Sequence, residues 1–273
     1  MLFYMIADDP AIAQFASANG VDRIFVDLEY MGKDERQKGL DTWKSRQGPD
    51  DVTKLREAVP GGHILVRVNP LHDGSAREID DVVARGADSV MLPMFRGADD
   101  LARFMDMLNG RAEALPLVET KAALDALPEI ATRIPLNRLH IGLNDLHLDM
   151  GLKFMFQIIA DGTLEDGCAA LRAAGIAFGI GGLARAHEGI VNPAVLLGEH
   201  VRLGSTAAIL SRTFHRGAES LAALREEMDF AAEVATLRGI YREFQAMSPD
   251  ALEQNRRLAA DRINDVVHLL SKR

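Results

Sequence analysis

The chain has 273 residues, of which 48% are hydrophobic and 26% charged, and its formal net charge is −9. These proportions are ordinary for a globular protein, and the acidic balance argues against a nucleic-acid partner, which would select a basic face. A single cysteine, Cys168, excludes an internal disulfide and a cysteine cage for a metal, so we expect it to pack as a small apolar residue.

The start of the chain predicts a strand followed by a helix. Asp9 is suited to cap that helix, with Pro10 in its first position, and Asn19-Gly20 is suited to end it. No apolar run of about 18 residues is present, so we expect no membrane span. The first residues also lack the basic leader and long apolar segment of a secretory signal, and we therefore expect a cytoplasmic protein.

Eight short apolar runs recur along the chain, and each precedes a segment with helical spacing. They are residues 2–7, 23–28, 63–68, 89–93, 115–118, 139–143, 176–180 and 201–203. Near-continuous apolar character is typical of strands covered on both faces, and alternation with helices predicts a parallel sheet. The length and the eight units favour an α/β fold closed as a (β/α)8 TIM barrel, with an open doubly wound sheet as the alternative.

The predicted barrel ends before the chain does. Residues 206–235 are expected to form the last barrel helix, so we predict a catalytic domain over 1–235 and a C-terminal helical extension over 236–273. Ser248-Pro249 predicts the start of a final helix. Its apolar positions form one stripe: Leu252, Ala259, Ile263, Val266, Val267 and Leu270. Because the barrel is already complete, that stripe should lie on the barrel's outside or on another subunit, which favours a homo-oligomer.

The connection over residues 30–60 is long and densely charged. Its charged residues include Lys33, Asp34, Glu35, Arg36, Lys38, Asp41, Lys44 and Arg46. Such density is typical of a solvated surface loop. A long loop that leaves the C-terminal end of a strand can also be a lid or a subunit contact.

Two apolar runs lead into acids, Glu119 and Asp145, about one strand-plus-helix unit apart. In a parallel sheet such residues lie on neighbouring strands at the same edge, where two carboxylates can share one divalent cation. Hard oxygen ligands suit Mg²⁺ or Mn²⁺, with other positions left to water and substrate, and do not suit a closed zinc site. The alternative is that each acid caps the following helix.

Other strand ends are also polar. Asp27 and Glu29 are two positions apart and share a face, so one of them could hold a metal-bound water, although Asp27 could instead be structural. Arg67 is suited to grip an anionic substrate, with a buried salt bridge to Asp27 or Glu29 as the alternative. His72 and His147 follow two strand ends and are either bases or loop histidines.

Two further motifs carry less information. Residues 179–182 read Gly-Ile-Gly-Gly, and their amides could face an anion or could permit tight packing. Ser205 lacks the histidine, the acid and the nucleophile elbow of a serine hydrolase.

Together the strand ends resemble a known family. Asp27-x-Glu29, Arg67, Pro93, Val-Glu119-Thr and Gly-x-Asn-Asp145-Leu are similar, in register to about residue 214, to the HpcH/HpaI aldolase and citrate lyase β-subunit family. The resemblance implies a phosphoenolpyruvate/pyruvate-type barrel in which Glu119 and Asp145 bind Mg²⁺ or a similar ion that chelates a 2-oxo acid. It also implies that Arg67 steadies the enolate oxygen, that Pro93, Asn144 and Asp145 lie beside the substrate, and that Glu29 supports the site.

The chain departs from that family at Tyr30. Pyruvate aldolases of the family carry a histidine there as base, and an ordinary tyrosine is a poor base at neutral pH. The catalytic residues implied are Arg67, Glu29, Tyr30 and His72, and proton transfer could also use water, His147 or Lys33.

Three functions follow from this resemblance. The first is a metal-dependent carbon–carbon lyase or aldolase acting through the enolate of pyruvate, oxaloacetate or a related 2-oxo acid. The second is a citrate-lyase-like or malyl-CoA-like enzyme acting on an acyl-CoA thioester. It is suggested by Asp27-Leu28-Glu29 followed by Lys33 and Arg36, and it would need a basic patch near the barrel mouth, for which the charged loop is the candidate. The third is a non-catalytic 2-oxo-acid-binding protein.

Overall fold

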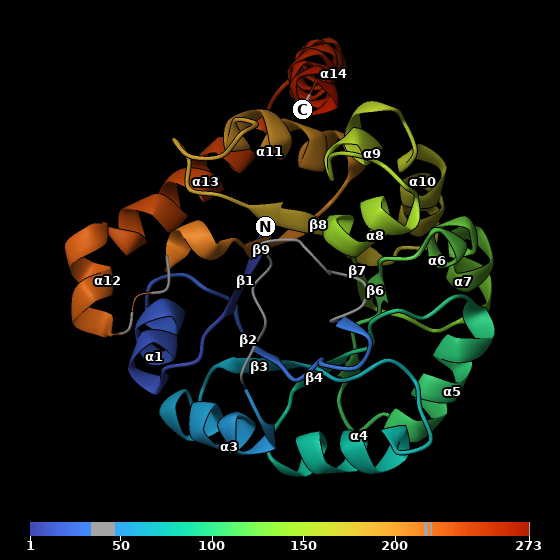
Figure 1. Cartoon of the computed structure of the whole chain (residues 1–273), viewed down its shortest axis with the longest axis vertical. Helices are drawn as coiled ribbons and strands as arrows, with labels where there is room; N and C mark the ends of the chain where they lie inside the picture. The colour runs from blue at the N-terminus through green and yellow to red at the C-terminus, as the bar shows by residue number, and fades with distance from the viewer. Residues whose placement is uncertain (34–46, 216–217, 219, 273) are drawn as a thin grey trace.

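The computed structural model describes residues 1–33, 47–215, 218 and 220–272 and has an α/β fold. Parallel strands form a curled nine-stranded sheet in the order β5-β4-β3-β2-β1-β9-β8-β7-β6, and the helices surround it (Figure 1). The strands are β1 (Leu2–Ile6), β2 (Arg23–Asp27), β3 (His63–Arg67), β4 (Ser89–Met91), β5 (Glu113–Ala114), β6 (Leu117–Val118), β7 (Arg138–Ile141), β8 (Ala177–Leu183) and β9 (Ala207–Leu210).

The helices follow the predicted alternation. They are α1 (Pro10–Ala18), α3 (Pro49–Ala58), α4 (Ser75–Ala84), α5 (Ala98–Leu108), α6 (Lys121–Asp125), α7 (Leu127–Arg133), α8 (Leu143–Asp149), α9 (Gln157–Ala160), α10 (Glu165–Ala173), α11 (Pro193–Leu203), α12 (Leu221–Glu227), α13 (Phe230–Gln245) and α14 (Pro249–Ser271), with a short 3-10 turn, η1 (Arg212–Phe214). Helix α1 is capped at both ends as predicted. The Asp9 side chain accepts from the amide of Ile12 at the N-terminus, and Asn19 is the C-cap.

The strand predicted over 115–118 lies in a segment that forms two short strands, β5 and β6. These two strands stand at opposite ends of the sheet order. The segment that carries both is continuous: the amides of Leu115 and Leu117 donate to β4-side carbonyls, each at 2.9 Å, and the carbonyl of Pro116 accepts from His140 at 2.9 Å. Proline has no N–H, so the ladder to β7 lacks one donor at position 116 and its pairing begins only at Leu117. The predicted barrel is therefore observed as a curled parallel sheet interrupted at Pro116.

The eighth predicted strand, residues 201–203, is wrong. These residues end helix α11, which begins at Pro193 under an Asn192 cap and terminates at Gly204 with φ +88°. The strand is β9, which pairs in parallel with both β1 and β8. The predicted helix over 206–235 is also wrong, because that segment contains β9, η1, α12 and the first residues of α13. The apolar stretch inside α11 was mistaken for a strand because a short apolar run fits either element.

The final two helices lie against the outside of the sheet and its helices. Helix α13 runs through positions 235 and 236, where the sequence predicted a domain boundary. Helix α14 begins at Pro249 under a Ser248 cap, as predicted, and packs on α11 and α9. Ala259 and Ile263 of its apolar stripe are buried there, while Leu270 is 38% exposed. Helix α14 lies on the outside of the molecule, beyond α11 (Figure 1).

Apolar side chains fill two layers, one between sheet and helices and one inside the curled sheet. The strands serve both layers, which accounts for their near-continuous apolar sequence. Cys168 packs in the outer layer as expected, and burial raises the pKa of its thiol to about 12. Within the described ranges, no helix combines the length and apolarity needed to cross a bilayer.

Strand β8 has no room for side chains at Gly179. A methyl group there would lie 2.3 Å from His140 Nδ1 and 2.9 Å from the carbonyl oxygen of Ala207. We therefore expect Gly179→Ala to lower the free energy of unfolding by about 2–3 kcal/mol, because the core must shift to admit it. Urea denaturation measures this loss. Gly61→Ala is the matched control, since no atom lies within 4 Å of its added methyl, and equal midpoints for the two variants would contradict the prediction.

Candidate active site

A cavity of about 370 Å³ lies at the C-terminal ends of the strands. Its charged lining residues are Asp27, Lys33, Arg67, Glu119, Asp145 and Arg212. They come from β2 and the segment after it, β3, the β6–α6 junction, α8 and the segment after β9. Because the strands are all parallel, their carboxyl ends meet at one edge, and residues distant in sequence converge there.

Asp27 is the centre of a buried ionic cluster in this cavity. It pairs in register with Arg67 and receives two hydrogen bonds from the guanidinium, from Nε and Nη2, each at 2.8 Å. Lys33 Nζ lies 2.8 Å from the same carboxylate. Burial alone would raise the pKa of Asp27, but Arg67 and Lys33 hold it at about 2. The buried salt bridge expected as the alternative for Arg67 is therefore present, and Arg67 still lines the cavity.

Glu29 completes the cluster from just beyond the end of β2. Its carboxylate lies 3.3 Å from Arg67 Nη1 and 3.8 Å from Lys33 Nζ, and the residue is 3% exposed. Burial lowers the pKa of Arg67, but Asp27 and Glu29 outweigh that effect and raise it. The guanidinium is thus permanently charged and fixed by two acids, which makes it a rigid cationic group at the cavity wall.

Glu119 follows β6 and is 2% exposed. Burial, together with the nearby carboxylates of Glu29 and Asp145, raises its pKa well above the ordinary value, although Arg67 opposes the shift. Its Oε1 accepts from the amide of Met94 at 3.1 Å. Met94 adopts φ +54°, a left-handed conformation that is costly for a side chain of its size, and such strain is typical of functional sites.

Asp145 does not stand at a strand tip, as the sequence suggested, but in the first turn of α8, because β7 ends at Ile141. Gly142 allows the start of α8 to lie close to the Glu119 side chain, because a methyl group at position 142 would lie 3.2 Å from Glu119 Oε2. Asn144 also lines the cavity. Neither acid is a helix cap: Thr120 caps α6 and Gly142 stands at the cap of α8, so the helix-cap alternative is wrong.

The cavity also contains residues that sequence analysis missed: His140, Ser211, Arg212 and His215. Burial lowers the pKa of His140 to about 4, and its Nε2 lies 3.0 Å from the carbonyl oxygen of Gly181, so the ring is neutral. Burial, with Arg212 nearby, also lowers the pKa of His215. The last three were missed because the eighth strand was placed too early. With the strand at Ala207–Leu210, Ser211 and Arg212 stand directly at its end.

Gly181 and Gly182, from the glycine-rich end of β8, line the cavity with their backbone. Gly181 adopts φ +48°, which favours glycine, and a methyl group there would lie 2.7 Å from Leu143 Cδ1. The tight packing that was one of the two alternatives for residues 179–182 is therefore present, and Gly181 and Gly182 also line the cavity.

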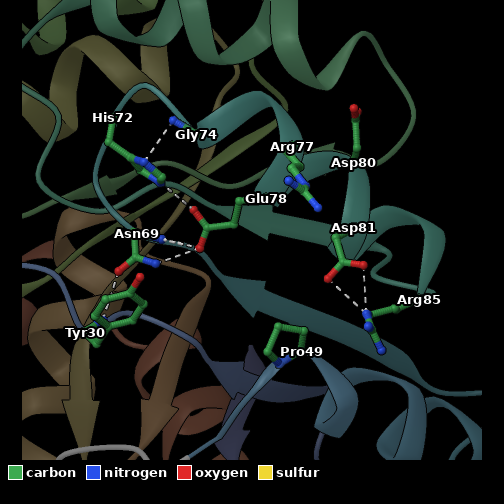
Figure 2. A pocket seen from close by; sticks show the side chains of 10 residues that line it. All are labelled: Tyr30, Pro49, Asn69, His72, Gly74, Arg77, Glu78, Asp80, Asp81 and Arg85. Atoms are coloured by element: carbon green, nitrogen blue, oxygen red, sulfur yellow. Dashed lines mark hydrogen bonds and ion pairs between the residues drawn. The ribbon is translucent and has the colours of Figure 1, made fainter.

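Several predicted site residues are not brought to this cavity. Tyr30 has 73% of its surface exposed and lines, with His72, a second cavity of about 780 Å³ (Figure 2). His147 lies on α8 with Nδ1 3.2 Å from the carbonyl of Leu143. Neither His147 nor Pro93, which is buried, is among the lining residues of the first cavity in the described part of the chain. The charged loop residues 34–46, proposed for CoA phosphates, lie outside the described residues.

The donor set fits a hard divalent cation. Asp27 is neutralised by Arg67 and Lys33, whereas Glu119 is buried next to further carboxylates, an arrangement that a shared cation would stabilise. Over residues 1–33, 47–215, 218 and 220–272, no group of three or more His, Cys, Asp or Glu side chains could hold a metal ion. Glu119 and Asp145 would therefore supply two oxygen ligands, with the remaining positions left to water and substrate.

The chain is similar to proteins of a known family. The family model described as HpcH/HpaI aldolase/citrate lyase matches residues 1–188. No curated protein sequence matches the chain. A family protein from Burkholderia cenocepacia has a similar structure, with a TM-score of 0.62 at 15% identity, covering 83% of this chain and 95% of that one.

Two further solved structures share the fold. CitE from Mycobacterium tuberculosis, in complex with magnesium and pyruvate, has a TM-score of 0.60 at 17% identity and covers 95% of this chain and 97% of its own. The citrate synthase SbnG has a TM-score of 0.55 at 17% identity, with 83% and 94% covered. At these identities the likeness concerns the fold alone.

Proposed function

Because the chain belongs to the HpcH/HpaI aldolase/citrate lyase family, we propose that it is a divalent-metal-dependent carbon–carbon lyase or aldolase. We propose that it acts through the enolate of pyruvate, oxaloacetate or a related 2-oxo acid. One observation carries this proposal: Glu119, Asp145 and Arg67 line the same cavity, with Glu119 buried among other acids. CitE, which shares the fold, was solved with magnesium and pyruvate, and this supports Mg²⁺ or Mn²⁺ as the cofactor here.

Arg67 would provide fixed positive charge for the reaction. A cation held by Glu119 and Asp145 would polarise the carbonyl of the 2-oxo acid. Arg67 would face the oxygen on which negative charge grows, and Asp27 and Glu29 would keep the guanidinium from turning away. A charge that is already in place needs no reorganisation during the reaction, and this is the largest electrostatic contribution that such a site can make.

Proton transfer would use residues other than Tyr30 and His72, which lie at the second cavity. We propose that neutral His215 accepts the proton from the carbon of the 2-oxo acid. Lys33, whose Nζ lies 2.8 Å from Asp27 and 3.8 Å from Glu29, would donate a proton to the oxygen of the bound carbonyl partner. In the cleavage direction the same groups would exchange these roles.

The pH dependence tests the role of His215. Because burial lowers its pKa, the imidazole should stay neutral, and able to accept a proton, below the ordinary value of 6.5. We expect the exchange rate to stay level from pH 8 to pH 6.5, and His215→Gln to reduce it by about 10²-fold. His268→Gln, on α14, is the control and should match the wild type. A rate that already falls on going from pH 8 to pH 7 would contradict the assignment.

The proposed function is tested by proton exchange. The protein is incubated with pyruvate and Mg²⁺ or Mn²⁺ in deuterated water, and loss of the methyl proton signal is followed by NMR. We expect exchange that stops when the metal is chelated and that falls about 10³-fold in Glu119→Gln. Glu129→Gln is the matched control, because the Glu129 side chain, on α7, is 53% exposed. Binding of pyruvate without exchange would favour a binding protein, or an enzyme that acts only on an acyl-CoA thioester.

A further inference from the structure

The second cavity contains a chain of hydrogen bonds that runs from His72 through Glu78 and Asn69 to Tyr30 (Figure 2). We call this chain the Asn69 relay; it consists of Asn69, Glu78, His72 and the backbone amides of Tyr30 and Met31. Asn69 follows β3, two residues beyond Arg67, and is 3% exposed. A polar side chain that is so deeply buried must satisfy its hydrogen bonds within the protein.

Every polar atom of the Asn69 side chain has a defined use. Its Oδ1 accepts from the amides of Tyr30 and Met31, each at 3.0 Å. Its Nδ2 donates to Glu78 Oε1 at 2.7 Å, and its own backbone amide donates to the same oxygen at 3.1 Å. Because two N–H groups meet one end and a carboxylate meets the other, the side chain has one favourable orientation.

His72 fixes the other side of the Glu78 carboxylate. The amide of Gly74 donates to His72 Nδ1 at 3.0 Å, so that nitrogen carries a lone pair. His72 Nε2 therefore bears the hydrogen and donates to Glu78 Oε2 at 3.1 Å. The neutral ring satisfies both contacts, and both carboxylate oxygens of Glu78 are held (Figure 2).

The two amides held by Asn69 begin the turn that delivers Lys33. Tyr30 directly follows Glu29, and the amide of Lys33 donates back to the carbonyl of Tyr30 at 3.3 Å. At the end of this turn Lys33 is 6% exposed, with Nζ 2.8 Å from Asp27 in the first cavity. The relay thus clamps the start of a four-residue turn whose last side chain stands in the active site.

We propose that Asn69, oriented by Glu78 and His72, is a positioning residue that holds Lys33 and Glu29 in place for the reaction. Tyr30 contributes its backbone and His72 its ring to this support. The importance of Lys33 for turnover rests on the proposed function, whereas the clamp itself does not. Removing the Asn69 side chain leaves two amides without their acceptor, so the turn should loosen while the ends of the strands keep their pairing.

The clamp is tested by the chemical reactivity of Lys33. Trace acetylation of the whole protein, followed by peptide mass spectrometry, measures Lys33 against exposed Lys54 on α3 in the same sample. In Asn69→Ala we expect Lys33 to react roughly tenfold faster, because opening of the turn exposes it, with Lys54 unchanged. Glu78→Gln should give a smaller increase. Asn192→Ala, which removes the cap of α11, is the matched control and should leave Lys33 protected.

The kinetic effect is measured separately by pyruvate exchange. We expect kcat to fall by roughly 10–10²-fold in Asn69→Ala, with KM within about threefold, because Lys33 is misplaced while the metal ligands remain. Asn69→Asp should be impaired by repulsion from Glu78. Adding Glu78→Gln to it should recover kcat by at least about threefold, which general loss of structure would not allow.

The outcomes separate the two proposals. Unchanged Lys33 reactivity in Asn69→Ala and Glu78→Gln would overturn the clamp. Increased reactivity with unchanged kcat would support the clamp but overturn the proposal that Asn69 positions Lys33 for the reaction. If the wild type exchanges no pyruvate protons, the proposed function fails, and the acetylation result alone then decides whether Asn69 holds the turn. Should Asn69→Ala not fold, Glu78→Gln with its partly exposed side chain supplies the same comparison.

Discussion

Asp27→Asn is expected to lower the free energy of unfolding at pH 7 by roughly 3–5 kcal/mol and to abolish pyruvate exchange. The carboxylate is the shared partner of Lys33, which is buried, and Arg67, whose side chain is 13% exposed, with three contacts at 2.8 Å. An amide can still accept hydrogen bonds but carries no charge, so the two cations would lose their closest acid. Breaking a buried ionic cluster is costly because the remaining charges stay out of water.

The lowered pKa of Asp27 predicts that the stability of the protein depends on pH. The pKa of this carboxylate in the folded protein is about 2, below the ordinary 3.8, so the folded state favours the ionised form. This contribution is present above pH 3.8 and is lost as the pH falls through 2; the shift corresponds to about 2 kcal/mol. Urea unfolding from pH 7 to pH 2 should show this loss in the wild type and not in Asp27→Asn.

The control for this prediction is Asp80→Asn on α4. Asp80 pairs with Arg111 at 2.7 Å, but its side chain is 61% exposed, and such surface pairs contribute about 0–1 kcal/mol. A loss in Asp27→Asn no larger than that in Asp80→Asn would show that the buried cluster is not an important source of stability.

Glu119→Gln is expected to act in the opposite direction on stability while removing activity. Burial and the neighbouring carboxylates raise the pKa of Glu119, so the folded protein holds this proton more tightly than the unfolded chain. The stability of the metal-free protein should therefore fall as the pH rises from about 4.5 through the raised value. At pH 8 without metal, we expect Glu119→Gln to be more stable than the wild type by about 1–3 kcal/mol.

Added Mg²⁺ or Mn²⁺ should reverse this order. A cation that binds only the folded wild type stabilises it by mass action, whereas the variant has lost one of two carboxylate ligands. Chemical denaturation at pH 5 and pH 8, with chelator or with metal, gives four values for each of the two proteins. A metal-free wild type that is more stable than Glu119→Gln at pH 8 would refute the idea that this acid is held at an energetic cost.

The sequence predicted much of the architecture and of the acidic site because strand ends are local features. Seven of the eight apolar runs correspond to strands or to parts of them, and the carboxyl ends of parallel strands necessarily meet. Asp27, Arg67, Glu119 and Asp145 therefore share a cavity as the pattern suggested. The run at 201–203 failed because so short a segment, Val201-Arg202-Leu203, fits a helix as well as a strand, and that error concealed Ser211, Arg212 and His215.

The direction of loop side chains could not be predicted from their spacing in the sequence. Tyr30 and His72 stand close in sequence to Glu29 and Arg67, yet they lie at another cavity, because the backbone turns after β2 and after β3. Which face a loop residue takes depends on partners that are distant in sequence, such as Asn69 and Glu78, and no local spacing reports them. The family membership and the two acids proposed as metal ligands were accessible from motifs; the groups proposed to move protons were not.

The first strand depends on parts of the chain that are made last. Strand β1 pairs with β9, the carbonyl of Met1 accepts from Arg238 at 2.9 Å, and Tyr241 donates to the carbonyl of Ser205 at 2.9 Å. At synthesis rates of about 5–20 residues per second, roughly 10–40 s separate the appearance of β1 from that of its partners. During this interval the apolar first strand has β2 beside it but lacks β9, so one of its two edges stays without its final partner.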